Sequence, residues 1–489
     1  MNDLKKNESN KKNNFISKIK TSFTGRKFRS GAYATIITTI VIGMVLVVNL
    51  FTSELDLKFD VSAQDMYTIT DQTTELVKAI DDDITMYYLV SAGDELDMFE
   101  KIIEKYDALS SNITVVKKDP VLYPKFTSQF VEDEVTENSI LIVNNSNGRA
   151  KYVDYQDMLV TEYDTTTYEP YTSAVDVEGQ ISSAIQYVTT TDLPIMYTVE
   201  GHGEFAIGET LTSSLEKQNV TVSSLSTLTV KSIPEDCSIL FINAPEYDYT
   251  MDEVTMIKDY MAAGGDVIIT LDFTAEGLVN FSSLLAYYGL DVVEGVIYEA
   301  DAGHYMGSYA NYLAPDVLSH SITSEVISNG KYIIVPGASG LTFLDNTRSS
   351  LTIEPLLTTS DTAYSKTNIN AETISKEDGD IEGPFTVGAI ATDTYNDITT
   401  NLIVYSSAYM LDESMTTISA VGNVDLFLNT ISYLSGTTSS LSIKTRSIIP
   451  EQVTLLASQK FFWGTIVVIV IPLIILVIGI VICIRRRRK

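Results

Sequence analysis

The residues best suited to chemistry are Gly201-His202-Gly203-Glu204, which directly follow the apolar run 194–199. Glycines let a backbone approach a bound group, an imidazole exchanges protons near neutral pH, and a carboxylate can act as a base or a ligand. A tight turn whose histidine and glutamate satisfy nearby backbone groups would use the same residue types. We therefore name Gly201, His202, Gly203 and Glu204 as candidates for binding, and we predict no catalytic residue.

Two familiar forms of nucleophilic catalysis do not fit the sequence. Amidotransferase-like enzymes carry a cysteine on the sharp turn after a central strand. Here the strand expected at 266–271 runs into Asp272-Phe273-Thr274, and Cys237 precedes a strand. In Gly337-Ala338-Ser339-Gly340 the second glycine comes one position too early for a serine nucleophile elbow. These patterns argue against a thiol or serine hydrolase.

Metal and nucleotide chemistry find little support in the sequence either. The histidines His202, His304 and His320 are too scattered for a zinc site, which needs ligands at short fixed spacings. No Gly-x-x-x-x-Gly-Lys-Ser/Thr loop occurs, so the chain does not hydrolyse a nucleotide in the P-loop manner. We expect no metal and no cofactor, and any energy for its function would come from a partner.

The elements that position the candidate residues form the clearest part of the sequence. Strand-like runs at 194–199, 238–243 and 266–271 alternate with helical runs at 210–218 and 250–261. Strands that alternate with helices predict a parallel sheet covered on both faces. We expect a doubly wound α/β fold whose candidate residues lie at the carboxyl end of a strand, where such sheets bind ligands.

A first α/β subdomain is expected at 52–191, before this unit. Thr70 is positioned to cap a helix. Further elements are strands at 84–90, 113–116 and 139–143 and helices at 95–109 and 175–188.

The second subdomain, 192–445, contains a long insertion whose signals are weak between 281 and 441. Expected there are strands at 333–335, 385–390 and 401–405, a surface excursion at 358–383, a helix at 423–434 and a last strand at 441–445.

Two long apolar runs flank these subdomains. Residues 31–51 and 461–484 contain no charged side chain, and a helix needs about 20 apolar residues to cross a bilayer. We predict a transmembrane helix at each. The first is read as an uncleaved signal anchor, because it is longer than the apolar core of a signal peptide. A stalk, 446–460, would join the outer region to the second span.

Positive charge sets the expected orientation. The tails 1–30 and 485–489 carry nine and five basic residues, and positive flanks stay in the cytoplasm. The chain is therefore expected in the cell membrane, in contact with lipid, with both termini cytoplasmic and 52–460 outside. That outer segment holds 19 basic and 62 acidic residues, against a net charge of −31 for the whole chain. Such an acidic surface excludes nucleic acid as a partner.

Several stretches resemble the GldG family, the auxiliary membrane proteins of ABC-type transport systems related to gliding motility. The resemblance rests on four stretches. The first is an apolar anchor followed by Phe59-Asp60-Val61-Ser62 and Met66-Tyr67-Thr68-Ile69-Thr70, and the second is Gly201-His202-Gly203-Glu204. The third is Asn243-Ala244-Pro245 with Glu253 and Tyr260-Met261-Ala262-Ala263-Gly264-Gly265, and the fourth is Gly422-Asn423-Val424-Asp425 before the terminal span. Ile69 and Thr70 stand where Leu-Ser is usual in the family, and the region 281–400 is not recognisable.

The resemblance implies an amidotransferase-like α/β outer region without catalysis, which works beside a membrane permease and a cytoplasmic ATPase. On that basis we expect a non-enzymatic subunit of an ABC-type transport system. Two alternatives stay open. One is a membrane-tethered enzyme that uses His202 and Glu204 on a cell-envelope glycan, and the other is a surface-binding protein.

Overall fold

The computed structural model describes residues 33, 36–47, 66–131, 135–163, 169–345, 347–371, 373–418, 420–436, 443, 445–448, 466, 469, 471–473, 479–480 and 484–485. By its internal contacts the chain divides into two units, 1–68 and 69–489. In the first unit, residues 36–47 are helical. Residues 1–30 and 486–489 lie outside the described residues, as do the ends of the predicted span 31–51 and most of the predicted span 461–484. Within the described ranges, no helix is both long and apolar enough to cross a membrane.

A four-stranded sheet in the order β2-β1-β3-β4 begins the second unit. Thr70 caps its first helix by accepting a hydrogen bond from the Thr73 backbone N–H, as predicted. The parallel pairing of β1 with β2 confirms the expected strand–helix–strand unit. β3 runs antiparallel to β1, a direction that a strand pattern does not encode. The elements are α3 (Asp71–Lys78), β1 (Ile84–Leu89), α4 (Asp97–Leu109), β2 (Ile113–Lys118), α5 (Pro124–Thr127), β3 (Ser139–Asn144), β4 (Ala150–Val153) and α6 (Val177–Thr189).

A three-stranded sheet joins distant parts of the chain. Its strands are β5 (Leu159–Tyr163), β6 (Pro170–Val175) and β22 (Arg446–Ser447), and the short helix η1 (Gln156–Met158) precedes β5. Residues 441, 442 and 444 of the last strand predicted at 441–445 lie outside the described residues. Arg446 and Ser447 pair with β6.

The large sheet has ten strands, and its centre is parallel. The five parallel strands lie in the order β8-β7-β9-β10-β21, which is 2-1-3-4-5 in chain order and is one of the two common doubly wound arrangements. These strands are β7 (Ile195–Glu200), β8 (Thr221–Ser226), β9 (Ile239–Asn243), β10 (Asp266–Thr270) and β21 (Ile398–Tyr405).

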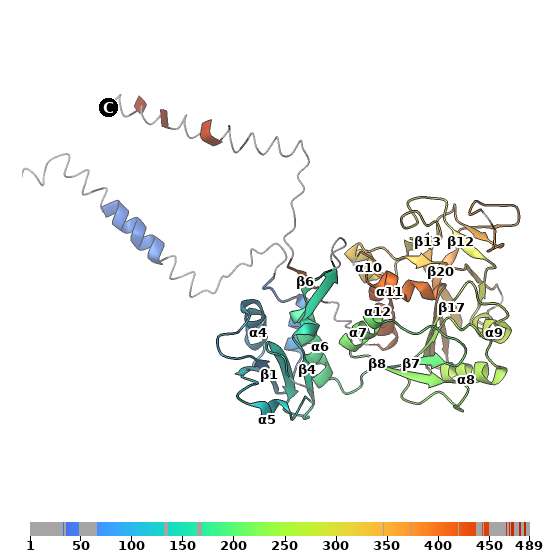
Figure 1. Cartoon of the computed structure of the whole chain (residues 1–489), viewed down its shortest axis with the longest axis horizontal. Helices are drawn as coiled ribbons and strands as arrows, with labels where there is room; N and C mark the ends of the chain where they lie inside the picture. The colour runs from blue at the N-terminus through green and yellow to red at the C-terminus, as the bar shows by residue number, and fades with distance from the viewer. Residues whose placement is uncertain are drawn as a thin grey trace, which may run out of the picture. The chain divides into compact units, whose positions relative to one another are not determined.

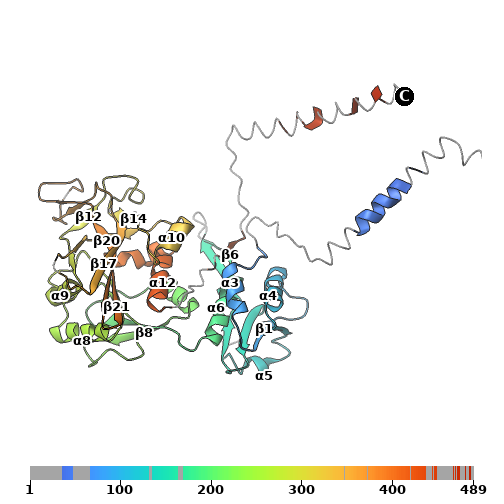
Figure 2. The same cartoon turned by 180° about the vertical axis from the view of Figure 1, so that it is seen from behind.

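Helices cover both faces of this sheet, as predicted. Figures 1 and 2 show α7 (Glu209–Lys217) and α12 (Asn423–Leu434) on one side and α8 (Met251–Ala262) and α9 (Val279–Tyr287) on the other. Alternate residues of β9 belong to separate cores: Phe241 packs in the cluster that contains α7 and α12 residues, and Leu240 in the cluster that contains α8 and α9 residues. This period-two alternation is why a short apolar strand can bury both of its faces.

The region 281–441 adds an antiparallel extension to the sheet, through β20 beside β21. The excursion predicted at 358–383 is wrong in part, because β18 and β19 pair there and Lys366 is buried. The many polar residues of this segment had led to the prediction that it lies on the surface. The elements are β11 (Leu290–Val292), β12 (Val296–Tyr298), β13 (Tyr312–Leu313), β14 (Asp316–Val317), α10 (Ser324–Asn329), β15 (Val335–Pro336), β16 (Leu341–Phe343), β17 (Leu351–Thr358), β18 (Tyr364–Lys366), β19 (Ile381–Glu382), β20 (Thr386–Tyr395), η2 (Ala408–Leu411) and α11 (Glu413–Thr416).

Candidate functional site

The candidate residues lie at the switch point of the large sheet. β7 and β9 are neighbours, but the chain leaves β7 through α7 on one face and β9 through α8 on the other. Gly201 to Glu204 directly follow β7, at its carboxyl end. The position expected from the sequence is therefore confirmed, and it is where doubly wound sheets open a crevice for ligands.

His202 is buried between two carboxylates. Only 4% of the residue is exposed. Its Nδ1 lies 3.5 Å from Oε1 of Glu204, and its Nε2 lies 3.4 Å from Oε1 of Glu253. The ring stacks on Tyr249, with centroids 3.9 Å apart and planes inclined by 13°. Both ring nitrogens thus face acidic groups of the protein itself.

The two carboxylates are held by internal donors. Glu204 accepts a hydrogen bond of 2.7 Å from the backbone N–H of His202 and another of 2.7 Å from the Tyr249 hydroxyl. Burial, together with the Glu204 carboxylate, raises the pKa of the Tyr249 hydroxyl far above its ordinary value. Tyr249 therefore stays protonated and keeps donating to Glu204.

Glu253 belongs to the amino-terminal turn of α8. Its side chain accepts from the Thr250 backbone N–H at 2.9 Å and from the Thr227 hydroxyl at 2.7 Å. Burial acts to raise the pKa of Glu253, but the hydrogen bonds from Thr250 and Thr227 outweigh it, so this pKa lies below its ordinary value. Glu253 is therefore ionised beside His202 at neutral pH.

The two glycines are required by the local backbone. Gly201 and Gly203 have φ of +125° and +79°, a region that side chains disfavour. A Cβ on Gly203 would lie 2.8 Å from Cβ of Glu246, in the loop after β9. In the same loop contact, the His202 carbonyl accepts hydrogen bonds from the N–H groups of Glu246 and Tyr247.

The arrangement locks the loop after β7 onto the loop after β9 and onto α8. Both ring nitrogens of His202 face carboxylates, although its buried Nδ1 makes no hydrogen bond with a described residue. The oxygens of Glu204 and Glu253 accept hydrogen bonds from protein donors, so none of these atoms is directed at a bound substrate. The geometry suits a rigid support beneath the switch point. That Gly201, His202, Gly203 and Glu204 contact a ligand stays a prediction. Gly201 and Gly203 are exposed, so a ligand could contact the backbone there.

The sequence analysis did not identify Tyr249 and Glu253 as part of this cluster. A usable signal was present: Thr250 begins the helical run predicted at 250–261, and a glutamate three residues later is the pattern of a capping box. The structure has that box, with Thr250 and Glu253 each bonding the other's backbone N–H. What the pattern could not give is that Glu253 also faces His202, since the two are far apart in sequence.

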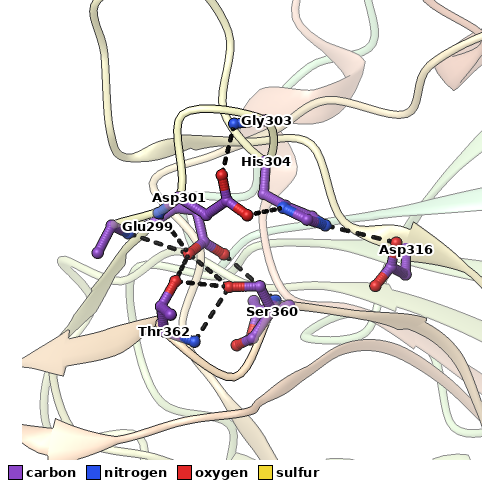
Figure 3. Close-up of polar contacts among 9 residues, drawn as sticks. Glu299, Asp301, Gly303, His304, Asp316, Ser360 and Thr362 are labelled. Atoms are coloured by element: carbon purple, nitrogen blue, oxygen red, sulfur yellow. Dashed lines mark hydrogen bonds and ion pairs between the residues drawn. The ribbon is translucent and has the colours of Figure 1, made fainter.

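A second polar cluster lies in the region 281–400, where sequence signals were weak. The buried Glu299 accepts hydrogen bonds from the hydroxyls of Ser360 and Thr362, at 2.7 and 3.0 Å (Figure 3). Beside it, His304 stands between Asp301, at 3.2 Å from Nδ1, and Asp316, at 3.5 Å from Nε2. Glu299 therefore ties the loop after β12 to the loop after β17.

The other residues considered for catalysis are placed as expected from the sequence. Cys237 is buried just before β9, at the amino edge of the sheet, away from the switch point. After β10, Asp272 occupies the turn and accepts a hydrogen bond of 3.0 Å from the Thr274 N–H. Among the described residues, no group of three or more His, Cys, Asp or Glu side chains could hold a metal ion.

Comparison with known families identifies two parts of the chain. Residues 196–430 match the family described as an ABC-type uncharacterized transport system, and residues 63–161 match a domain of unknown function (DUF7088). Residues 196–430 of the large α/β region are therefore similar to the ABC transport auxiliary family. No curated protein matches the chain in sequence.

Solved structures offer only distant likenesses. The mmIFT52 N-terminal domain is 15% identical, covers 51% of this chain and 100% of its own, and has a TM-score of 0.38. PurLQS from Thermotoga maritima is 8% identical, covers 50% of this chain and 99% of its own, and has a TM-score of 0.26. At TM-scores below 0.5 these likenesses carry no argument about fold or function.

Proposed function

We propose that this chain is a non-catalytic auxiliary subunit of an ABC-type transport system, of the GldG type, anchored in the cell membrane by two spans. In this proposal both termini are cytoplasmic, the acidic α/β region lies outside, and the spans contact a permease that works with a cytoplasmic ATPase. The match of residues 196–430 to an ABC transport auxiliary family supports the transport assignment. The apolar runs 31–51 and 461–484 support the anchoring.

The observation that carries the non-catalytic assignment is the burial of the candidate acid–base group. His202 has both ring nitrogens turned toward buried carboxylates, and the side chains of Glu204 and Glu253 are 3% and 7% exposed. A general acid or base must reach the proton that it transfers. This geometry favours a scaffold at the switch point over a membrane-tethered enzyme acting on glycan.

Purification with partners tests the transport assignment. The full-length protein, extracted in mild detergent, is expected to co-purify with a multi-span permease and a P-loop ATPase that mass spectrometry identifies. A chain in which residues 461–484 are replaced by an unrelated membrane span serves as the control and should recover less permease. Recovery of neither partner from the native membrane would contradict the proposal.

The enzymatic alternative is tested separately. Glu204→Gln keeps the size of the side chain and one of its two accepting oxygens, and it removes the carboxylate. If the chain is non-catalytic, a strain carrying Glu204→Gln at normal protein levels should keep its transport phenotype. Loss of the phenotype with unchanged partner recovery and unchanged thermal stability would instead favour catalysis.

A further inference from the structure

A groove lies at the amino edge of the large sheet, at the opposite end of the strands from the candidate residues. Its cavity volume is about 740 Å³, and it is lined by the starts of β7, β9 and β10, the last turns of α8, and the end of α12. Binding sites for small molecules typically enclose about 300–1,000 Å³. The groove is therefore large enough for a ligand, and nothing in the proposed function uses it.

The rim of the groove is acidic. Asp192, Glu235 and Asp259 line it with exposed carboxylates, and Lys231 is the one basic side chain among the lining residues that the structure describes. A concave surface with charges of one sign concentrates the field and attracts ligands of the opposite sign. The rim therefore favours a cation.

Two helix ends add to this negative potential. Both α8 and α12 end at the groove, which Ala263, Gly264, Leu434 and Ser435 help to line. The carboxyl end of a helix carries a partial negative charge, which a basic residue in the last turn usually offsets. Neither helix has a basic residue there.

Asp266, at the start of β10, is the buried acid of the groove. The residue is 8% exposed, and its Oδ1 accepts hydrogen bonds from the backbone N–H and the side-chain amide of Asn401, at 2.7 and 3.0 Å. Burial raises the pKa of Asp266 to about 6, because the ionised carboxylate is less stable in its buried position than in water. A cation in the groove would relieve that cost.

Apolar side chains complete the lining. Ile233 is buried, and Met256 and Leu434 are half-buried in the same groove. A small hydrated metal ion would gain nothing from them, whereas an alkyl chain would bury apolar area against them.

We propose that this groove binds an organic cation, whose ammonium or guanidinium group meets Asp266 and whose alkyl chain lies along Ile233, Met256 and Leu434. The same chemistry occurs in a free polyamine and in the lysine or arginine side chains of a peptide. The proposal does not depend on the transport function, because it rests on the groove alone.

Titration calorimetry of the full-length protein in detergent tests the proposal, with spermidine and the tripeptide Lys-Leu-Lys as the probes. At least one probe should bind, and Asp266→Asn should weaken that binding at least about tenfold, since it removes the charge that faces the ligand. Binding of spermidine alone would identify a polyamine as the ligand, and binding of the tripeptide alone would identify a basic chain. Either result supports the proposal.

Because any acidic protein attracts polyamines weakly, the control must change net charge equally. Asp252→Asn does so at the opposite end of α8, where Asp252 is exposed in the first turn, and it should leave the affinity unchanged. Asp259→Asn, on the exposed rim, should weaken binding about threefold. If Asp266→Asn does not fold, the Asp259→Asn variant is used to test the proposal. The proposal is overturned if neither probe binds, if both Asp266→Asn and Asp259→Asn bind normally, or if Asp252→Asn loses as much affinity as they do.

Discussion

Two histidines of this chain each stand between two carboxylates, but they differ in burial. The His202 side chain is 5% exposed, between Glu204 and Glu253. The His304 side chain is 26% exposed, between Asp301 and Asp316, which are more than half exposed. Removing a buried ring leaves a cavity among the groups packed around it, whereas water replaces a ring at the surface.

We therefore expect His202→Ala to lower the free energy of unfolding by about 3–5 kcal/mol, and His304→Ala by no more than about 1 kcal/mol. Urea unfolding of the full-length protein, followed by near-ultraviolet circular dichroism, measures both. His304→Ala is the matched control, because it removes the same ring from a similar pair of acids. Equal losses in the two variants would show that burial of the His202 ring does not set the cost of its removal.

Asp266 makes stability depend on pH. Its pKa is about 6 in the folded protein, against an ordinary value of 3.8, so the folded state holds its proton more tightly than the unfolded chain does. Protonated Asp266 therefore adds to the free energy of unfolding below about pH 4. This contribution, about 3 kcal/mol in total, is lost as the pH rises through 6.

Asp266→Asn should remove that dependence while keeping an oxygen that accepts from Asn401. At pH 8 the variant is expected to be more stable than the parent by up to about 3 kcal/mol, and the difference should disappear near pH 4. Thermal unfolding across this pH range measures it, with the exposed Asp259→Asn as the control. A difference that does not change with pH would contradict the assigned cause.

At the scale of elements, the capping box of α8 connects helix stability to the candidate site. Thr250 accepts from the Glu253 backbone N–H, while Glu253 accepts from the Thr250 N–H and also faces His202. Thr250→Ala removes one cap bond and a hydroxyl donor to Glu253. We expect a loss of about 1–2 kcal/mol in unfolding free energy.

Thr255→Ala provides the comparison within α8, because Thr255 is exposed and its hydroxyl bonds only the Met251 carbonyl one turn earlier. It should change stability by less than about 0.5 kcal/mol. Hydrogen exchange of the first α8 amides, measured by mass spectrometry, should speed up in Thr250→Ala alone. Equal exchange in both variants would mean that tertiary packing, not the cap, holds this end of the helix.

Local patterns predicted those elements whose signals lie within a few residues. The start of α8 at Thr250 and the apolar run of β9 are examples. They led to the prediction of the parallel centre of the sheet and of the position of Gly201-His202-Gly203-Glu204. The two-residue strand β13 is too short to show a period, and it forms through its pairing with β15. Lys366 reads as surface from its type, but the acids Glu377 and Asp380 reach it and allow its burial. Pairing and charge compensation over distance cannot be read from one chain's local sequence.

At the scale of the whole molecule, charge and hydropathy are segregated along the chain. The acidic segment 52–460, with 62 acidic and 19 basic residues, separates two uncharged apolar runs that are flanked by basic tails. An excess of basic residues keeps a flank in the cytoplasm, and two spans with cytoplasmic flanks place the intervening segment outside. The proposed topology follows from this segregation alone.

Cysteine labelling tests that topology in intact cells. Asp97→Cys places a thiol on α4, where the aspartate side chain is 91% exposed, and Ser17→Cys places one in the basic tail. A membrane-impermeant maleimide should label Asp97→Cys before lysis and Ser17→Cys only after it, because the bilayer shields the cytoplasmic tail. The parent chain gives the background from Cys237, which is buried, and from Cys483. Labelling of Ser17→Cys in intact cells, or protection of Asp97→Cys, would reverse the orientation. It would then also remove the outer surface on which the proposed transport role depends.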